Sequence, residues 1–383
     1  MPLHFSDAEL ADRRARACGL MAEAGLDGLL MFRQESLYYL TGYDTFGYVF
    51  FQCLYLGADG RLMLLTRSAD LRQAQQTSMI VDIRIWVDGP NANPAAELRE
   101  ILREFGCAGK RLGVEYEAYG LTAANGKRLD AALDGFCSLE DASGLVSRLR
   151  VVKSPAEIAY VREAAGLAAA AWRAALDRPG PGAFEGDILA AMHGAIFSGG
   201  GDDPANEFII GSGKGALLCR YFSGRRILDP RDQLTLEWAG TYRHYHAAMM
   251  RTVPIGAAQP LHREMHQVAQ DALLAVEACL RPGKTYGEAF DAHGRVMDAA
   301  GYQAHRLNAC GYSLGTTFAP NWMDWPMLYH ANPVPFEPGM VVFCHMILFN
   351  SQDGVAMTLG RTSLGSEGAA EPRSKAGLAL DTR

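Results

Sequence analysis

Two residues that can transfer protons stand beside or within apolar runs of the sequence. Glu237 lies inside the run Leu234–Trp238, and His345 directly follows the run Val341–Cys344. A carboxylate in a buried strand costs several kcal/mol unless it is paired, and such a cost favours a functional role. We therefore take both as candidate catalytic residues. The alternatives are a buried ion pair between Glu237 and an arginine, and a core role for His345.

Two further groups have side chains suited to a site. His246 shares strand parity with Ala248 and Met250, so these three side chains face one side of the predicted strand. Trp322, Asp324 and Trp325 follow one another closely and would form an aromatic wall around a small, cationic substrate group. The alternatives are a structural histidine and a loop that packs on a partner subunit.

The first 150 or so residues mix strand and helix patterns. Helical periodicity covers residues 7–25 and 97–105, and apolar runs bounded by turn residues indicate strands at 26–32, 52–56, 62–66 and 111–114. This mixture predicts a small α/β domain with a mixed sheet.

A capping box marks the start of a second domain. Ser154 and Glu157 have the spacing of the box, and Pro155 occupies the first helical position. A long alanine-rich helix should follow to about Leu176. We place the domains at residues 1–152 and 153–383.

The second domain contains a faint internal repeat. Arg178–Gly180 and Arg281–Gly283 each follow one predicted helix and precede another, at residues 184–197 and 286–299. Strands are predicted afterwards at 208–211, 234–239, 242–253, 341–350 and 356–363. Two α-β units related by pseudo-twofold symmetry would place a site between the two halves, although chance also explains two such short motifs.

Composition excludes several classes of partner. The formal net charge is −7 without a basic run, which argues against nucleic acid binding. The eight cysteines are scattered without a CxxC pair, as expected in a reducing cytoplasm. Neither a signal peptide nor an apolar stretch long enough to span a membrane is evident. We expect a soluble cytoplasmic protein whose last fifteen or so polar residues are loose.

Several segments, in the same order along the chain, resemble the creatinase/aminopeptidase P/prolidase family. They are Tyr38–Tyr43, the domain junction Leu149–Ile158, Tyr245–Thr252, Arg281–Gly283 and Pro338–Val341. The resemblance covers nearly the whole chain. It implies a C-terminal domain of the pita-bread fold, a homodimer, and a lid formed by residues 42–46 and Tyr48 over the neighbouring subunit's site.

The metal-dependent members of that family use two aspartates, one histidine and two glutamates to hold two divalent ions. Counted from Arg251-Thr252, these positions fall on Glu237, Ala248, Tyr312, His345 and a residue near Gly360. Alanine and glycine offer no side-chain ligand. The resemblance therefore implies that this chain has no two-metal site, and we expect no cofactor.

Creatinase and ectoine hydrolase look like the closer relatives, as judged from Gly311–Gly315 and Tyr245–Ala247. The family's catalytic histidine position holds Arg220, so the usual base is absent. Arg361 stands beside the second glutamate position. Both arginines are expected near the reaction centre, where each would hold a substrate carboxylate, unless each forms a structural ion pair.

We therefore predict a metal-independent hydrolase of a C–N bond in a small metabolite that bears an amidine or amide and a carboxylate. His345 or His246 would be the base, Glu237 would orient the water or bind nitrogen, and Tyr312 would stabilise the oxyanion, unless it only packs. The alternatives are an Xaa-Pro dipeptidase or aminopeptidase and a non-catalytic pita-bread binding protein.

Overall fold

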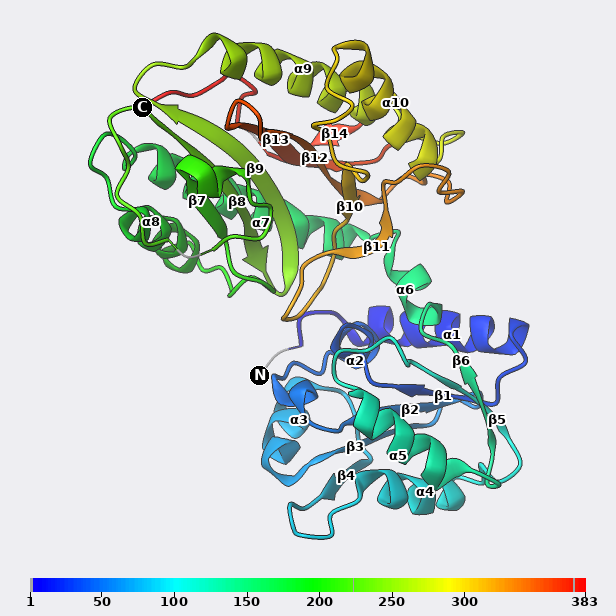
Figure 1. Cartoon of the computed structure of the whole chain (residues 1–383). Coiled ribbons are helices and arrows are strands. Elements are labelled where there is room, and N and C mark those ends of the chain that lie inside the picture. Colours follow the sequence, from blue (N-terminus) through cyan, green and yellow to red (C-terminus); the bar gives the residue numbers. More distant parts are fainter. Residues whose placement is uncertain (1–2, 223, 375) are drawn as a thin grey trace. The chain divides into compact units, whose positions relative to one another are not determined.

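The computed structural model describes residues 3–222, 224–374 and 376–383, and the chain separates into two compact units (Figure 1). The first unit comprises residues 1–150 and the second residues 151–383. Residues just after the division belong to the second unit by their contacts, since Val152 forms a bridge to Met340 and the Lys153 N–H donates to the Gly339 carbonyl. We describe each unit by itself.

The N-terminal unit is built on one six-stranded mixed sheet. Its strand order is β4-β3-β2-β1-β5-β6, with antiparallel pairs β1–β2 and β2–β3 and parallel pairs elsewhere. The strands are β1 (Gly28–Met31), β2 (Cys53–Gly57), β3 (Leu62–Arg67), β4 (Ile83–Trp86), β5 (Arg111–Val114) and β6 (Ser138–Asp141). The predicted α/β domain with a mixed sheet is confirmed.

Helices cover both faces of this sheet. They are α1 (Asp7–Glu23), α2 (Gln34–Thr41), α3 (Leu71–Thr77), α4 (Pro94–Glu104), α5 (Ala123–Leu133) and α6 (Leu145–Arg150). One apolar cluster joins the sheet to α1, α2 and α6, and another joins it to α4 and α5. The central strands β1, β2, β3 and β5 are therefore mostly buried, whereas the edge strands β4 and β6 are partly exposed.

The C-terminal unit contains an eight-stranded antiparallel sheet. The main path runs β11-β10-β12-β13-β9-β8-β7, and β14 pairs with β13. The strands are β7 (Ile209–Ser212), β8 (Asp232–Tyr242), β9 (Tyr245–Ile255), β10 (Gly311–Ser313), β11 (Asp324–Met327), β12 (Val341–Asn350), β13 (Val355–Leu364) and β14 (Glu371–Pro372).

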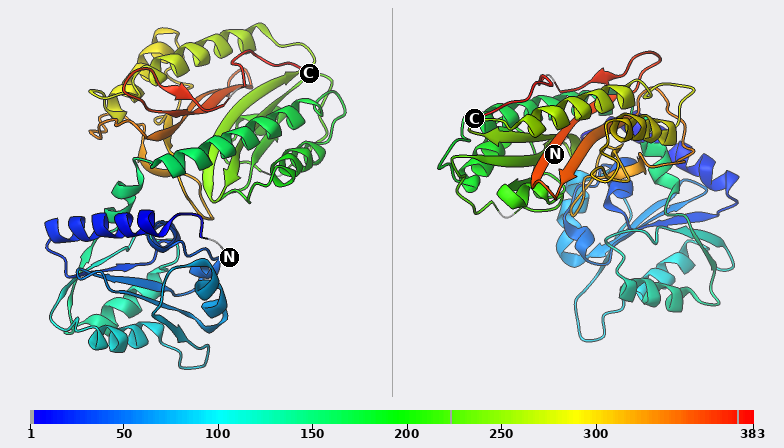
Figure 2. Two further views of the ribbon diagram at one scale, coloured as in Figure 1. Left: turned by 180° about the vertical axis from the view of Figure 1, so that it is seen from behind. Right: turned by 45° about the horizontal axis from the view of Figure 1, so that its top comes forward.

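Two pairs of helices pack against this sheet: α7 (Pro155–Leu176) with α8 (Glu185–Ser198), and α9 (Pro260–Glu277) with α10 (Tyr286–Ala299). The first pair precedes β7, β8 and β9, and the second precedes β10 to β13, so the predicted repeat of α-β units is present. The pairing of β9 with β13 joins the two halves. Figure 2 shows α7 lying along β8 and β9.

Side chains along each strand alternate between the face of the sheet that the helices cover and the opposite face. On β8, Trp238 stacks on Trp172 of α7 with ring centroids 5.2 Å apart, and its Nε1–H donates to the Ala168 carbonyl. On the same face, the backbone of α7 approaches Gly240 so closely that a Cβ there would lie 2.0 Å from the Ala164 carbonyl oxygen. Because neighbours in a strand alternate, Glu237 points away from α7.

The expectation of a loose C-terminal tail is wrong for the described residues. Leu378 and Leu380 pack against the apolar core beneath α9. The backbone of Arg383 exchanges hydrogen bonds with Pro254 and Gly256 at the end of β9. Two leucines spaced among polar residues thus hold this segment in place.

Among the described residues, the structure holds no helix with both the length and the apolarity needed to cross a membrane.

Candidate active site

Two of the predicted catalytic residues lie in one row across the C-terminal sheet. Glu237 pairs with Met250, Met250 with Gly360, and Gly360 with His345. Residues directly opposite each other in antiparallel strands project to the same face. The register therefore brings Glu237 on β8 and His345 on β12 to the face away from the helices, although the sequence separates them by more than a hundred residues.

These side chains line a cavity of about 160 Å³. Five of the predicted site residues contribute to it: Arg220, Glu237, Tyr312, Trp322 and His345. The others were not predicted: Asn206, Ile209, Cys219, Leu307, Ala309, Asn321, Met323, Met327 and Ile347. Most of this second group lie in loops, where periodicity gives no signal.

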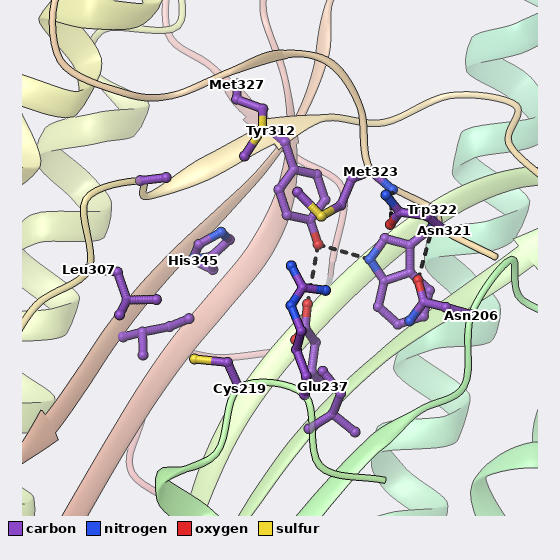
Figure 3. Close-up of a pocket in the computed structure, with 14 residues that line it drawn as sticks. Asn206, Cys219, Glu237, Leu307, Tyr312, Asn321, Trp322, Met323, Met327 and His345 are labelled. Carbon is purple, nitrogen blue, oxygen red and sulfur yellow. Dashed lines mark hydrogen bonds between the residues drawn. The ribbon is translucent and has the colours of Figure 1, made fainter. Parts of the chain in front are cut away.

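A chain of hydrogen bonds connects Glu237 to the loop that carries Trp322 (Figure 3). Tyr312 donates its hydroxyl proton to Glu237 Oε1 at 3.2 Å, and Trp322 Nε1–H donates to the Tyr312 oxygen at 2.8 Å. The Trp322 backbone N–H is held in turn by Asn206 Oδ1 at 3.1 Å. Since Tyr312 has one hydroxyl proton, the predicted oxyanion-stabilising role would require its bond to Glu237 to break.

Burial changes the proton affinity of this pair. It raises the pKa of Glu237 to about 7, even though the hydrogen bond from Tyr312 and the charge of Arg220 act in the opposite direction. Burial, together with the nearby Glu237 carboxylate, raises the pKa of Tyr312 well above its usual range. Tyr312 therefore remains a neutral hydrogen-bond donor, whereas Glu237 can exist in both protonation states near neutral pH.

His345 lies among aromatic rings at the wall of the cavity. Its ring centroid is 5.5 Å from those of Tyr312 and Phe343. Its Nδ1 is buried and has no hydrogen-bond partner among the residues described. Burial, with a further contribution from His293, lowers the pKa of His345 to about 4. The imidazole is therefore neutral at physiological pH.

Arg220 lies on the turn that follows the short 3-10 helix η3 (Gly213–Leu217). Its side chain is exposed and reaches the cavity, where its charge acts on Glu237. Within the described parts of the chain, no carboxylate or carbonyl binds its guanidinium group. An unpaired guanidinium at a cavity wall is suited to bind an anionic substrate group.

His246 does not line the cavity and lies behind the Trp322 loop. Its Nε2 accepts the Ala205 N–H at 2.9 Å, which leaves Nδ1 as the protonated nitrogen facing Thr317 Oγ1 at 3.1 Å. It is fully buried, and burial lowers its pKa to about 3. Since both ring nitrogens are occupied, the geometry does not support the predicted role of His246 as a base, and we assign it to holding the loop.

The predicted placement of Arg361 near the reaction centre is also not met. Its Nε and Nη2 bind the two carboxylate oxygens of Glu277 on α9 at 2.7 and 2.6 Å, and Ser363 donates to the same carboxylate. The physical reason is strand parity. Arg361 directly follows Gly360, and the Gly360 position faces the cavity. Because adjacent residues in a strand project to opposite faces, the Arg361 side chain points to the helix-covered face.

The remaining predicted substrate-binding residues do not line this cavity. Asp324 lies on β11, where its Oδ2 and the Lys153 Nζ are each 3.4 Å from the position of a Cβ on Gly315. Trp325 is exposed on the same strand. Tyr48 belongs to the N-terminal unit, where it is buried with its ring edge-to-face to Phe46. Its contact with a substrate stays a prediction.

The side chains on this face do not fit a two-metal centre. Ala248 and Gly360 have no ligand atoms, and a Cβ at Gly360 would lie 2.9 Å from the ring of Phe343. Tyr312 already donates to Glu237 and accepts from Trp322. In the described ranges, no group of three or more histidine, cysteine, aspartate or glutamate side chains is placed to hold a metal ion.

Comparison with known proteins gives the class of this fold and site. Residues 13–152 match the creatinase/prolidase N-terminal domain, and residues 159–365 match metallopeptidase family M24. A protein named uncharacterized hydrolase/peptidase y4tM, from Sinorhizobium fredii, is 30% identical over 93% of each chain. Ectoine hydrolase from Halomonas elongata is 28% identical over 88% of each chain.

Solved structures agree on the fold. The dipeptidase PepE from Mycobacterium ulcerans superposes with a TM-score of 0.85 over 99% of both chains, at 24% sequence identity. The chain therefore belongs to the M24 family, with the family's creatinase-like N-terminal domain and pita-bread C-terminal domain. It is a hydrolase of a family that acts on C–N bonds.

Proposed function

We propose that this protein hydrolyses a C–N bond of a small amide or amidine that carries a carboxylate, without a metal ion. The observation that supports this most strongly is the content of the cavity. At the positions where the family resemblance places the ligands of two ions, this chain has Glu237, Ala248, Tyr312, His345 and a residue near Gly360, a set with one carboxyl group. Water must then be activated by side chains alone.

The size of the cavity favours a small metabolite. The cavity has a volume of about 160 Å³. Sites for drug-sized ligands are about 300–1,000 Å³. Arg220 offers a guanidinium to a substrate carboxylate, and the wall formed by Trp322 and the methionines is apolar. The ectoine hydrolase relative suggests that a compact cyclic amidine is a suitable first compound to test.

Other relatives carry the name Xaa-Pro dipeptidase, for example one from Pyrococcus furiosus at 21% identity, which favours peptide cleavage as the second candidate. That activity would need a way to activate water without the metal ligands described above. A third possibility is a protein that binds the same small molecules without turning them over. Incubation of the purified protein with ectoine, creatine and Xaa-Pro dipeptides, followed by product analysis, distinguishes the three.

Hydrolysis is expected to be independent of metal ions. The purified protein should contain less than one transition metal ion per chain by elemental analysis, and dialysis against a chelator should leave its rate on the best compound unchanged, because the side chains lack a ligand set. Two bound ions per chain, together with loss of activity on chelation and recovery with Mn²⁺ or Zn²⁺, would contradict the proposal.

We also propose a homodimer in which residues 38–51 border the partner subunit's cleft, as the resemblance to the creatinase/prolidase family implies. Phe46, Val49 and Phe50 in this segment are 71%, 45% and 42% exposed, and adjacent exposed apolar residues favour an interface. Light scattering at micromolar concentration should give about twice the chain mass of 41.6 kDa. A mass of one chain under these conditions would refute the dimer.

A further inference from the structure

The position of the family's usual catalytic histidine holds Arg220, so another group must move protons if the protein is a hydrolase. Among the described residues at or near the cavity, we consider His246, His345 and Glu237 for this role. His246 already uses both ring nitrogens, toward Ala205 and Thr317. It does not line the cavity, and its side chain is fully buried.

His345 faces a different difficulty. A histidine base becomes an imidazolium during the reaction, and both of its N–H groups then need acceptors. Nδ1 of His345 is buried without a partner among the described residues. The cation would therefore form next to aromatic rings with one donor unsatisfied, which disfavours proton uptake. The low pKa of His345, about 4, is consistent with this reasoning.

Glu237 has the geometry that the histidines lack. Its Oε1 accepts the hydroxyl proton of Tyr312, which Trp322 fixes through its indole N–H. Its Oε2 accepts no hydrogen bond from any residue that the structure describes, and the side chain lines the cavity. One oxygen is thus anchored while the other is available to a water molecule or a substrate nitrogen.

We propose that Glu237 is the proton-transferring catalytic residue of this enzyme, acting first as general base on water and then as general acid on the leaving nitrogen. The proposal rests on the hydrolytic function proposed above, and it names the residue that takes the place of the family's usual histidine base. It differs from the role expected from the sequence, in which a histidine was the base and Glu237 oriented the water or bound the substrate.

In this scheme Glu237 alone accepts and returns the proton that is transferred during hydrolysis. In the first step, the water oxygen bonds to the amide or amidine carbon while one water proton passes to Glu237 Oε2. In the second step, that proton passes from Oε2 to the substrate nitrogen and the C–N bond breaks. The hydroxyl group stays on carbon, the proton leaves on nitrogen, and Glu237 returns to its ionised form without any other reactant.

The surroundings of Glu237 suit both steps. The charged and titratable groups that act on it are Tyr312 from β10 and, from the turn after η3, Arg220 and Cys219. Its cross-strand neighbours Ile209 and Met250 are apolar. A carboxyl group whose pKa lies near 7 can both take and return a proton at physiological pH.

Chemical rescue tests the assignment. Removal of a positioned general base costs typically 10²–10⁴-fold in rate, so Glu237→Ala should lose activity by about that factor on the best compound of the panel. Added formate, a small carboxylate that fits the space left by the side chain, should restore at least tenfold. Glu237→Gln keeps the shape and should stay inactive with formate. Glu207→Ala, which removes an exposed carboxylate near β7, should retain the wild-type rate.

A pH profile adds a second readout. The ionised carboxylate is the active base, so kcat/KM of the wild type should rise with pH through the pKa of Glu237, about 7. Trp322→Phe removes the N–H that holds Tyr312, and we expect it to shift the pH at which kcat/KM rises. A purely structural change would alter only the maximum value of kcat/KM. Trp322 and Tyr312 are thus positioning residues.

The outcomes separate this assignment from the proposed function. If the wild type hydrolyses none of the compounds in the panel, the proposed function fails and the assignment fails with it. If the wild type is active and Glu237→Ala keeps its rate, or loses it without rescue by formate, only the assignment fails. Mass spectrometry after turnover in H₂¹⁸O gives a further check, because ¹⁸O in the Glu237 carboxyl group would mean that Glu237 attacks the carbon itself.

Discussion

The Arg361→Met variant is expected to unfold with a free energy about 3–5 kcal/mol lower than that of the wild type, because it leaves the Glu277 carboxylate buried without its partner. The two side chains are only 11% and 8% exposed, and they form a bidentate pair under α9. Since this pair lies on the helix-covered face, the folded fraction should bind substrate normally. Denaturant unfolding, with substrate affinity measured on the same samples, checks both parts.

Two variants control this experiment. Arg361→Met combined with Glu277→Met removes both charges, and most of the lost stability should return because neither partner remains buried alone. Lys284→Met removes an exposed ion pair between Lys284 and Glu288, which is four residues further along the chain. The melting temperature of this variant should barely change. Loss of substrate affinity in Arg361→Met at unchanged stability would show that the arginine acts at the site after all.

The contrast between Arg220 and Arg361 shows what a sequence can reveal about a site. Both arginines stand at or beside positions where relatives have functional residues, which suggested that both lie near the reaction centre. Strand alternation already separates Arg361 from Gly360, however, because adjacent residues in a strand face opposite sides. The wrong placement came from using sequence proximity in place of strand parity.

The fold itself was largely predictable, because long periodic segments carry a strong signal. The helix after Ser154 runs to Leu176 as predicted, and residues 286–299 and 341–350 form the predicted helix and strand. The prediction missed α5, whose buried residues are few, and α2, in which buried residues follow one another without period. In such segments, tertiary contacts determine the structure rather than local pattern.

Only the site residues that lie on strands could be predicted from the sequence. Glu237 and His345 interrupt apolar runs, so burial and charge conflict visibly in the sequence. His246 interrupts a similar run, but its partners Ala205 and Thr317 come from loops that no period describes. The same holds for Asn206, which accepts the Trp322 N–H. A sequence pattern indicates that a polar group is buried, but it does not reveal which loops satisfy that group.

The Arg220→Met variant is expected to weaken capture of the best substrate by about two orders of magnitude, with little loss of stability. Loss of a charged contact to a substrate carboxylate in a partly dry site costs about 2–5 kcal/mol. The Arg220 side chain is exposed, and no ion pair of the folded chain depends on it in the described residues, so the fold should be unaffected. The measurements are kcat/KM, substrate affinity and melting temperature.

Two comparisons make this result specific. Arg225→Met removes an exposed arginine on the same segment that does not line the cavity, and it should leave affinity unchanged. An uncharged amide analogue of the substrate carboxylate should bind the wild type and Arg220→Met about equally, because the guanidinium then has no anion to hold. If Arg220→Met weakens the charged substrate and the amide analogue to the same extent, Arg220 shapes the cavity rather than binding a carboxylate. In that case, the substrate class proposed here would have to be abandoned.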